Sequence, residues 1–251
     1  MSTKHMLAAA VAALALGHAA QAQNVQVFYD FGKDRNYITT TFEMFKADKF
    51  GDTFWFIDHY FNPFDKDASS KMPIENLGPA NGSYFEIERG INFWGESALK
   101  DLSGHVEYDG LITGSGFNMG TWCFGLKYFF HSQDFSKTLT LYAMYERFAN
   151  NGFSSADVPV KFSAVWGIND LFGLKGLTFK GFADFWGNDN AWGGSLADNT
   201  KWSFLTEPQL WMNLGSLFDS HLDIGGEVEL SYNFVAKGFK CNPCAGIRWT
   251  F

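Results

Sequence analysis

The stretch 222–234, LDIGGEVELSYNF, alternates apolar and polar side chains along almost its whole length. The apolar parity holds Leu222, Ile224, Val228, Leu230, Tyr232 and Phe234, and the polar parity holds Asp223, Glu227, Glu229, Ser231 and Asn233. A period of two is typical of a β-strand, whose successive side chains point to opposite faces. One face of this strand is therefore expected to meet an apolar environment and the other a polar one.

The same alternation recurs along the chain after residue 22. It is clear at 120–130, 138–147 and 158–168, and weaker at 25–32, 37–46, 53–61, 84–93, 105–112, 177–187, 201–212 and 243–251. Most of these segments have about 9–11 residues, the length of a tilted strand that crosses a bilayer. Twelve such strands predict an all-β fold, a transmembrane antiparallel up-and-down β-barrel.

Composition excludes several other classes of protein. The 251 residues are 18% aromatic and 18% charged, with a net charge of −8. Disordered chains have few aromatic residues, and nucleic acid as a partner calls for positive charge. A soluble β-sandwich would also alternate, but it could not bury so polar a second face. Aromatic residues at strand ends, as in membrane-interface girdles, favour the barrel. We assign to this outward girdle Tyr128, Phe130, Tyr145, Trp166, Phe185, Trp202, Trp211, Tyr232 and Trp249.

The first 22 residues differ from the rest of the chain. Lys4 and His5 precede an apolar run from Met6 to Leu16, and Ala20-Gln21-Ala22 ends the segment. This is the layout of a secretory signal peptide, which predicts cleavage before Gln23 and export. Residues 23–251 would then form a barrel in the bacterial outer membrane, in contact with its lipid and lipopolysaccharide. Cys241 and Cys244 could form a small disulfide in that oxidising location or remain thiols.

If the apolar face meets lipid, the polar parity lines a lumen. Aromatic rings on that parity, at Tyr29, Tyr84, Tyr142, Phe182 and Trp186, offer flat faces for stacking a ring-shaped solute. The inward parity of 25–32 and 53–61 stays open. Carboxylates outnumber bases, so the lumen should favour cations or neutral polar solutes. The residues predicted to contact a solute are Glu86, Glu88, His105, Glu107, Asp109, Lys161, Asp184, Trp186, Glu227 and Glu229.

No catalytic or metal site is predicted. An enzyme would need a nucleophile beside a base, and the chain has no G-x-S-x-G motif. His105, Glu107 and Asp109 share one strand face, but the ends of such a trio lie about 10 Å or more apart, too far for one ion. We therefore interpret this trio as a polar wall, and expect no enzyme activity, metal or cofactor.

Three stretches resemble the nucleoside-specific channel-forming porins of the outer membrane, the Tsx-like family. They are Gly51–Phe56, Tyr84–Arg89, and the run from Val160 through Asn169-Asp170-Leu171-Phe172-Gly173 to Phe182–Asp189. The resemblance implies a monomeric twelve-stranded barrel with a narrow lumen that takes up nucleosides, or similar small polar solutes, passively. The alternatives are a structural or adhesive barrel with a plugged lumen, a barrel enzyme acting on lipid, and a soluble secreted binder.

Overall fold

The computed structural model describes residues 21–33, 35–61, 81–113, 118–148, 156–192, 199–215, 221–234 and 236–251. The predicted signal peptide falls mainly on residues 1–20, outside this described part. The described residues form thirteen strand segments and a short 3-10 turn, Leu171–Gly173. The strands are β1 (Gln21–Asp30), β2 (Ile38–Asp48), β3 (Gly51–Phe61), β4 (Asn81–Ile91), β5 (Leu102–Thr113), β6 (Asn118–His131), β7 (Lys137–Phe148), β8 (Val160–Ile168), β9 (Leu177–Ala191), β10 (Asn199–Thr206), β11 (Gln209–Asn213), β12 (Leu222–Tyr232) and β13 (Phe239–Thr250).

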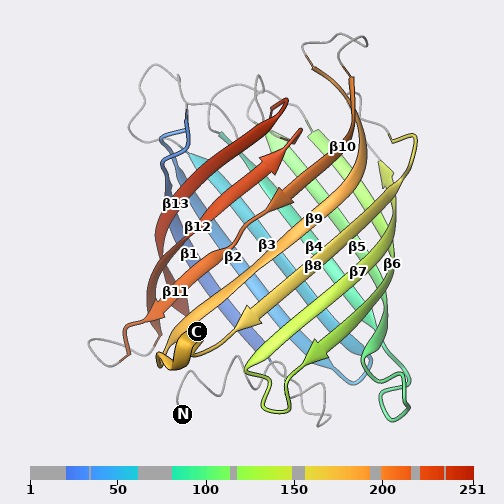
Figure 1. Cartoon of the computed structure of the whole chain (residues 1–251), viewed down its shortest axis with the longest axis vertical. Coiled ribbons are helices and arrows are strands. Elements are labelled where there is room, and N and C mark those ends of the chain that lie inside the picture. The colour runs from blue at the N-terminus through green and yellow to red at the C-terminus, as the bar shows by residue number, and fades with distance from the viewer. Residues whose placement is uncertain are drawn as a thin grey trace.

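The strands close into an antiparallel barrel (Figure 1). From β1 to β10 and from β11 to β13 each strand pairs with the next along the chain, and β13 returns to pair with β1, with Asn24 opposite Thr250. β10 and β11 both lie between β9 and β12, so together they fill one position in the wall. The predicted twelve-stranded barrel is therefore confirmed.

The single strand predicted over 201–212 is wrong in one respect, because it divides at Glu207 and Pro208. Proline has no N–H to donate to a ladder, so Pro208 removes one of the backbone hydrogen bonds that a regular strand would make here. The wall stays closed because the Glu207 N–H donates to the Phe182 carbonyl at 3.1 Å, and the Pro208 carbonyl accepts from the Val228 N–H at 3.1 Å.

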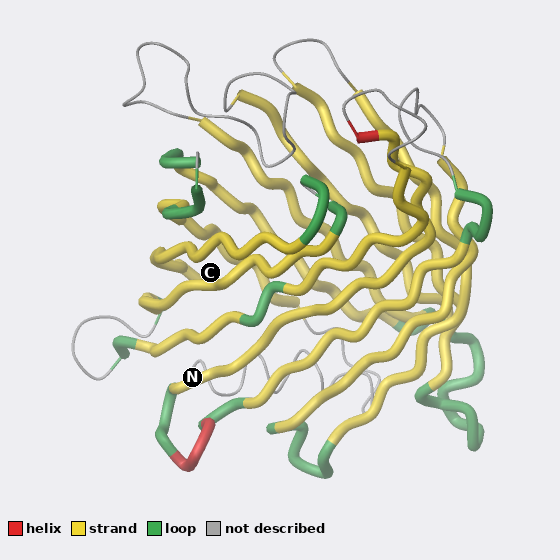
Figure 2. The backbone as a smooth tube through the Cα atoms, turned by 45° about the horizontal axis from the view of Figure 1, so that its top comes forward, coloured by secondary structure: helices red, strands yellow, loops and turns green. Residues whose placement is uncertain are grey.

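Four connections at one end of the barrel are described completely: residues 49–50, 92–101, 132–136 and 169–176. They lie at the lower end in Figures 1 and 2, where β1 begins and β13 ends. The connection from β1 to β2, which contains Arg35 and Tyr37, lies at the opposite, upper end.

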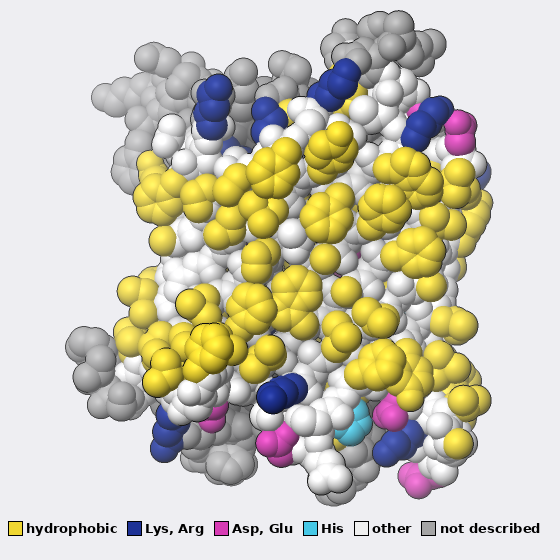
Figure 3. All heavy atoms as spheres, viewed as in Figure 1, with side chains coloured by type: hydrophobic (Ala, Val, Ile, Leu, Met, Phe, Trp, Pro, Cys, Tyr) yellow, Lys and Arg dark blue, Asp and Glu magenta, His cyan; other side chains and the backbone are white. Residues whose placement is uncertain are grey.

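The outside of the wall is apolar, as the alternation predicts. On β6, Trp122, Phe124 and Leu126 are 41%, 45% and 54% exposed, whereas Cys123 and Lys127, on the opposite parity, are buried. Apolar side chains cover the visible face in a broad band, and charged side chains gather at its two ends (Figure 3). Among the described residues, no helix is long and apolar enough to span a membrane.

The structure decides the two strands whose parity the sequence left open. On β1 Gln26, Phe28 and Asp30 face the interior, so Tyr29, predicted to line it, instead points outward and packs against the exposed Phe31. On β3 Asp58 faces inward and accepts a hydrogen bond from the Thr41 hydroxyl at 2.6 Å.

Trp211, assigned to the outward girdle with Trp202, also faces inward. The two residues are nine positions apart, an odd number, so alternation places them on opposite faces. The Trp211 indole is fully buried and lies 5.6 Å from the Phe28 ring. The Arg248 guanidinium lies 4.6 Å from the centre of the Trp211 ring, and the Trp211 Nε1–H donates to Gln209 Oε1.

Candidate functional site

The interior wall from β5 to β9 is organised around Lys161 of β8. Its Nζ lies 2.6 Å from Glu107 Oε1, 3.5 Å from Asp109 Oδ2 and 3.5 Å from Asp184 Oδ2. Glu107 and Asp109 lie two residues apart on β5 and so share its inner face, while Asp184 lies opposite Ser163 on the neighbouring β9. The single cation therefore joins three carboxylates, and we call these four residues the Lys161 cluster.

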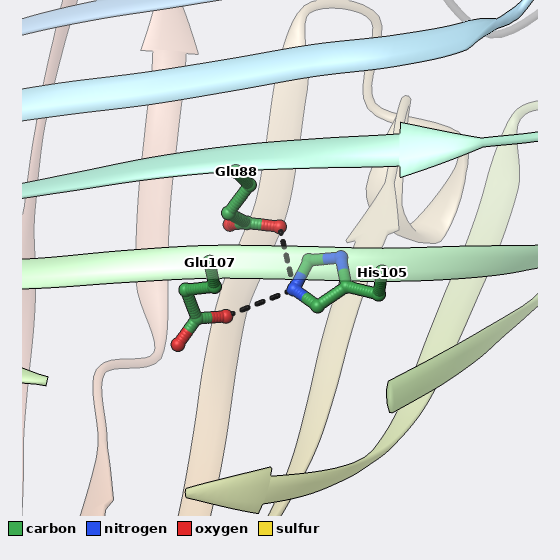
Figure 4. A group of neighbouring side chains, drawn as sticks. All are labelled: Glu88, His105 and Glu107. Carbon is green, nitrogen blue, oxygen red and sulfur yellow. Dashed lines mark hydrogen bonds and ion pairs between the residues drawn. The ribbon is translucent and has the colours of Figure 1, made fainter. Parts of the chain in front are cut away.

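His105 connects this cluster to β4. Its Nε2 lies 3.0 Å from Glu107 Oε2 and 3.7 Å from Glu88 Oε2 (Figure 4). Glu88 lies directly opposite Glu107 in the β4–β5 register, and His105 precedes Glu107 by two residues. Strand pairing therefore brings Glu88, His105 and Glu107 together, and we call them the acid–histidine triad.

Aromatic side chains surround these charged groups. The Tyr142 ring meets His105 edge-on at 4.8 Å, and Lys127 Nζ lies 5.8 Å from the same ring while pairing with Asp52. The Tyr84 hydroxyl donates to Glu86 Oε2 at 3.4 Å. Trp186, opposite Lys161 in the β8–β9 register, is nearly buried and meets the Phe234 ring edge-on at 5.3 Å. The inward orientation predicted for Tyr84, Tyr142 and Trp186 agrees with these contacts.

Glu227 and Glu229 of β12 belong to a different group. The Gln209 amide donates to Glu227 Oε2 at 2.8 Å. Arg35 Nη2 donates to both carboxylate oxygens of Glu229, at 3.0 and 2.9 Å, and Nη1 donates to Asp30 Oδ2 at 2.9 Å. We call Asp30, Arg35 and Glu229 the Arg35 clasp. Of the ten predicted solute contacts, the structure thus places eight on β4, β5, β8 and β9 and two on β12.

One ion pair crosses the interior. Glu43 of β2 and Lys180 of β9 lie 3.6 Å apart, although several strands separate β2 from β9 in either direction around the wall. The two side chains are 23% and 20% exposed even though they face the interior. The barrel therefore encloses space beside this pair that water can reach, and the pair narrows that space.

Sequence reasoning missed several of these residues. Arg35 lies between two predicted strands, where alternation gives no direction, and Tyr37 begins the weakly alternating segment 37–46; both are buried. Tyr37 packs with Tyr60 and Leu111 in an apolar cluster near the upper end of the barrel. Glu43 lay on a weakly alternating segment. A buried arginine in a turn can be recognised only once its acidic partners have been placed.

Carboxylates exceed cations in the wall around the triad. Seven acids, Asp52, Glu86, Glu88, Glu107, Asp109, Glu146 and Asp184, meet two lysines and His105. In the described part of the chain, two sets of three residues offer ligand atoms that all lie within 4.8 Å of one another: the acid–histidine triad, and Glu107 with Asp109 and Cys123. The interior can thus accept hydrogen bonds, attract cations, and present ring faces to a solute.

Comparison with protein-family models identifies the family of this chain. The model described as a domain of unknown function (DUF5020) matches residues 22–251. The chain belongs to the DUF5020 family. A search of curated proteins gave no match.

Solved structures share the barrel at very low sequence identity. The NanC porin matches with a TM-score of 0.54 and 10% identity, covering 90% of this chain and 98% of the porin. The KdgM porin in complex with disordered oligogalacturonate gives 0.49 and 7%, covering 92% and 99%. A BenF-like porin from Pseudomonas fluorescens Pf-5 gives 0.46 and 9%, covering 93% and 98%. The likeness to NanC shows that this DUF5020 chain has a porin-like barrel fold.

Proposed function

We propose that this DUF5020 chain is a narrow outer-membrane channel for the passive uptake of nucleosides or similar small polar, ring-containing solutes. The observation that carries the proposal is an interior that combines carboxylates with aromatic rings, inside a closed wall whose outer surface is apolar. In this proposal residues 1–22 act as a signal peptide, and the chain works as a monomer without enzymatic activity.

The apolar outer band supports placement in a membrane. Charged side chains gather beyond both ends of the band, where lipid head groups and lipopolysaccharide would lie (Figure 3). A closed barrel pairs every strand edge, which a spanning structure requires because the hydrocarbon region offers no water to backbone groups. The girdle of outward tyrosine and tryptophan residues supports the same placement.

The interior favours a neutral or cationic solute that carries both a ring and hydroxyl groups. Carboxylates such as Glu86 and Glu227 can accept hydrogen bonds from hydroxyls, and the Trp186 indole offers a ring to pack against. Each contact is individually modest, as passage requires. The proposed contacts are Glu86, Glu88, His105, Glu107, Asp109, Lys161, Asp184, Trp186, Glu227 and Glu229.

A barrel with a plugged lumen is the second candidate. The Arg35 clasp and the cluster around Tyr37 favour it, because they bring the connection between β1 and β2 inward at the upper end. In that case the chain would be a structural or adhesive barrel that conducts no ions.

Single-channel conductance of the refolded protein in a planar bilayer tests both candidates. We expect small channels that adenosine and thymidine block at concentrations at which glucose does not. Trp186→Leu should weaken the block, whereas Trp202→Leu, which removes an outward tryptophan, should not. Equal block by glucose would overturn the nucleoside proposal, and an absence of conductance would favour the plugged barrel.

A further inference from the structure

The acid–histidine triad has the dimensions of a metal site. Zinc binds histidine nitrogen and carboxylate oxygen at about 2.0–2.2 Å, so two ligand atoms in a tetrahedral site lie roughly 3.4 Å apart. His105 Nε2 lies 3.0 Å from Glu107 Oε2 and 3.7 Å from Glu88 Oε2, which brackets that value. All three ligand atoms lie within 4.8 Å of one another. Small side-chain rotations are therefore enough to centre an ion among them.

The side chains of the acid–histidine triad point toward one another and are buried in the wall. Figure 4 shows Glu88 reaching from β4 and His105 and Glu107 from β5, with the imidazole Nε2 directed at the two carboxylates. Their side chains are 9%, 0% and 4% exposed, so a bound ion would be shielded from water. Lys161 uses Oε1 of Glu107, which leaves Oε2 for the triad.

A second and independent observation concerns Asp109. Its side chain is only 9% exposed, and its Oδ1 has no hydrogen-bond partner among the described residues. Asp109 also presents a ligand atom within 4.8 Å of one on Glu107. A buried carboxylate oxygen without a donor carries a desolvation cost that a nearby cation would remove.

The charge balance points the same way. Even with His105 protonated, the seven carboxylates of this wall meet only three positive charges. Uncompensated buried charges are costly unless they are paired or coordinate a metal. Glu146, whose Oε2 also lacks a partner among the described residues, lies opposite Cys123 in the β6–β7 register and adds to this excess.

We propose that Glu88, His105 and Glu107 bind one divalent transition-metal ion, of the class represented by Zn²⁺ and Co²⁺, on the inner wall of the barrel. Imidazole and carboxylate together suit this class of ion. The neighbouring Asp109 lowers the electrostatic cost of the added charge. The site depends on strand register, since the spacing along β5 alone separates His105 from Asp109 too widely for one ion.

Co²⁺ titration of the refolded full chain in detergent, followed by visible absorption, tests the site. The experiment uses the Cys241→Ser, Cys244→Ser background, because those two cysteines are free and could bind the probe themselves. We expect one equivalent of Co²⁺ to bind with a spectrum of nitrogen and oxygen ligands. His105→Phe, which keeps a ring beside Tyr142, should weaken binding by at least about tenfold, since even the loss of a supporting residue behind a ligand costs that much.

His59→Phe is the matched control, since His59 lies exposed on the outward parity of β3. It should bind Co²⁺ as the background protein does. Glu88→Gln, almost isosteric, provides a second variant should His105→Phe not fold, and heat-modifiable migration in gels reports folding for each.

Two results would overturn the site. The first is an absence of Co²⁺ binding to the folded background protein, which would mean that protons neutralise the carboxylates. The second is unchanged binding in a folded His105→Phe or Glu88→Gln variant. Neither result depends on conductance, so this site and the channel proposal can fail separately.

Discussion

The Arg35 guanidinium donates hydrogen bonds to both carboxylate oxygens of Glu229, at 2.9 and 3.0 Å, across 194 positions of sequence. The same side chain pairs with Asp30, and the Asn242 amide donates to Glu229 at 2.9 Å. The connection between β1 and β2 is thereby tied to β12 at the upper end of the barrel.

Removing this clasp should open the upper end. Arg35→Ala leaves Glu229 without its cation, and breaking a buried pair in this way costs up to about 3–5 kcal/mol of unfolding free energy. We expect larger single-channel conductance and a lower denaturation midpoint. Lys33→Ala, an exposed lysine in the same connection, is the control. Identical conductance in Arg35→Ala and the parent protein would show that this connection does not restrict the lumen.

The pair that crosses the interior should govern ion selectivity. Lys180→Ala removes the positive partner of Glu43 and leaves a carboxylate beside water-accessible space. We expect higher conductance and a stronger preference for cations, measured as reversal potential in a salt gradient. Because both groups are partly exposed, the stability change should stay below about 1 kcal/mol. Lys175→Ala, in the exposed connection 169–176, should leave the reversal potential unchanged.

Two lysines offer a matched test of burial. Lys161→Met removes the cation that pairs with three carboxylates in the interior, and we expect the unfolding free energy to fall by about 3–5 kcal/mol. Lys201→Met breaks ion pairs with Asp157 and Asp189 on an exposed lysine, and should cost no more than about 1 kcal/mol. Denaturant unfolding in detergent distinguishes them, and similar losses would argue that water solvates the Lys161 cluster.

A charged side chain on the outward face of β6 should impair insertion into a membrane. Leu126 lies near the middle of β6 and is 54% exposed. An arginine at the bilayer midplane costs about 2–4 kcal/mol, so Leu126→Arg should reduce folding into liposomes, measured by heat-modifiable migration. Leu126→Phe should insert normally. Efficient insertion of the arginine variant would contradict the assignment of this face to lipid.

The hydrogen bonds that Asp134 accepts in the connection 132–136 should persist to low pH. The Ser132 and Ser136 hydroxyls and the Ser136 N–H donate to Asp134 and hold the pKa of its carboxyl at about 2, below the ordinary 3.8. Its contribution to stability is therefore complete above pH 3.8 and lost as the pH falls through about 2. Carboxyl chemical shifts recorded against pH in Asp134-labelled protein should titrate near 2. A midpoint near 3.8 would show that these hydrogen bonds do not persist in solution.

The barrel itself could be predicted because alternation reports each strand separately. The number of strands and most side-chain directions were predicted correctly, as at Tyr142 and Lys161. Pro208 was a signal for the break, since proline lacks a ladder donor, but it was not decisive, because β13 continues through Pro243. Tyr29 was misplaced because polar and aromatic residues occur on both parities of β1, where Asp30 and Gln26 turned out to define the inner face.

The site was harder to predict because it depends on which residues lie opposite one another. Along β5, His105 and Glu107 form a row, and only the β4–β5 register adds Glu88 to them. The spacing of His105, Glu107 and Asp109 along β5 argued against a metal site. The pairing of β4 with β5 nevertheless brings the ligand atoms of Glu88, His105 and Glu107 close together. Arg35 was beyond reach for a different reason, since a connection between strands has no periodicity to direct its side chains.

The seam between β1 and β13 joins the first and last strands of the described chain, with paired residues from Asn24–Thr250 to Asp30–Cys244. Until those last residues are in place, β1 and β12 each present an edge without a partner, and an open edge is prone to join the wrong chain. A chain without β13 would therefore keep two open strand edges in place of a closed wall. Closure of the wall thus depends on a pairing between the two strands that lie farthest apart in the described sequence.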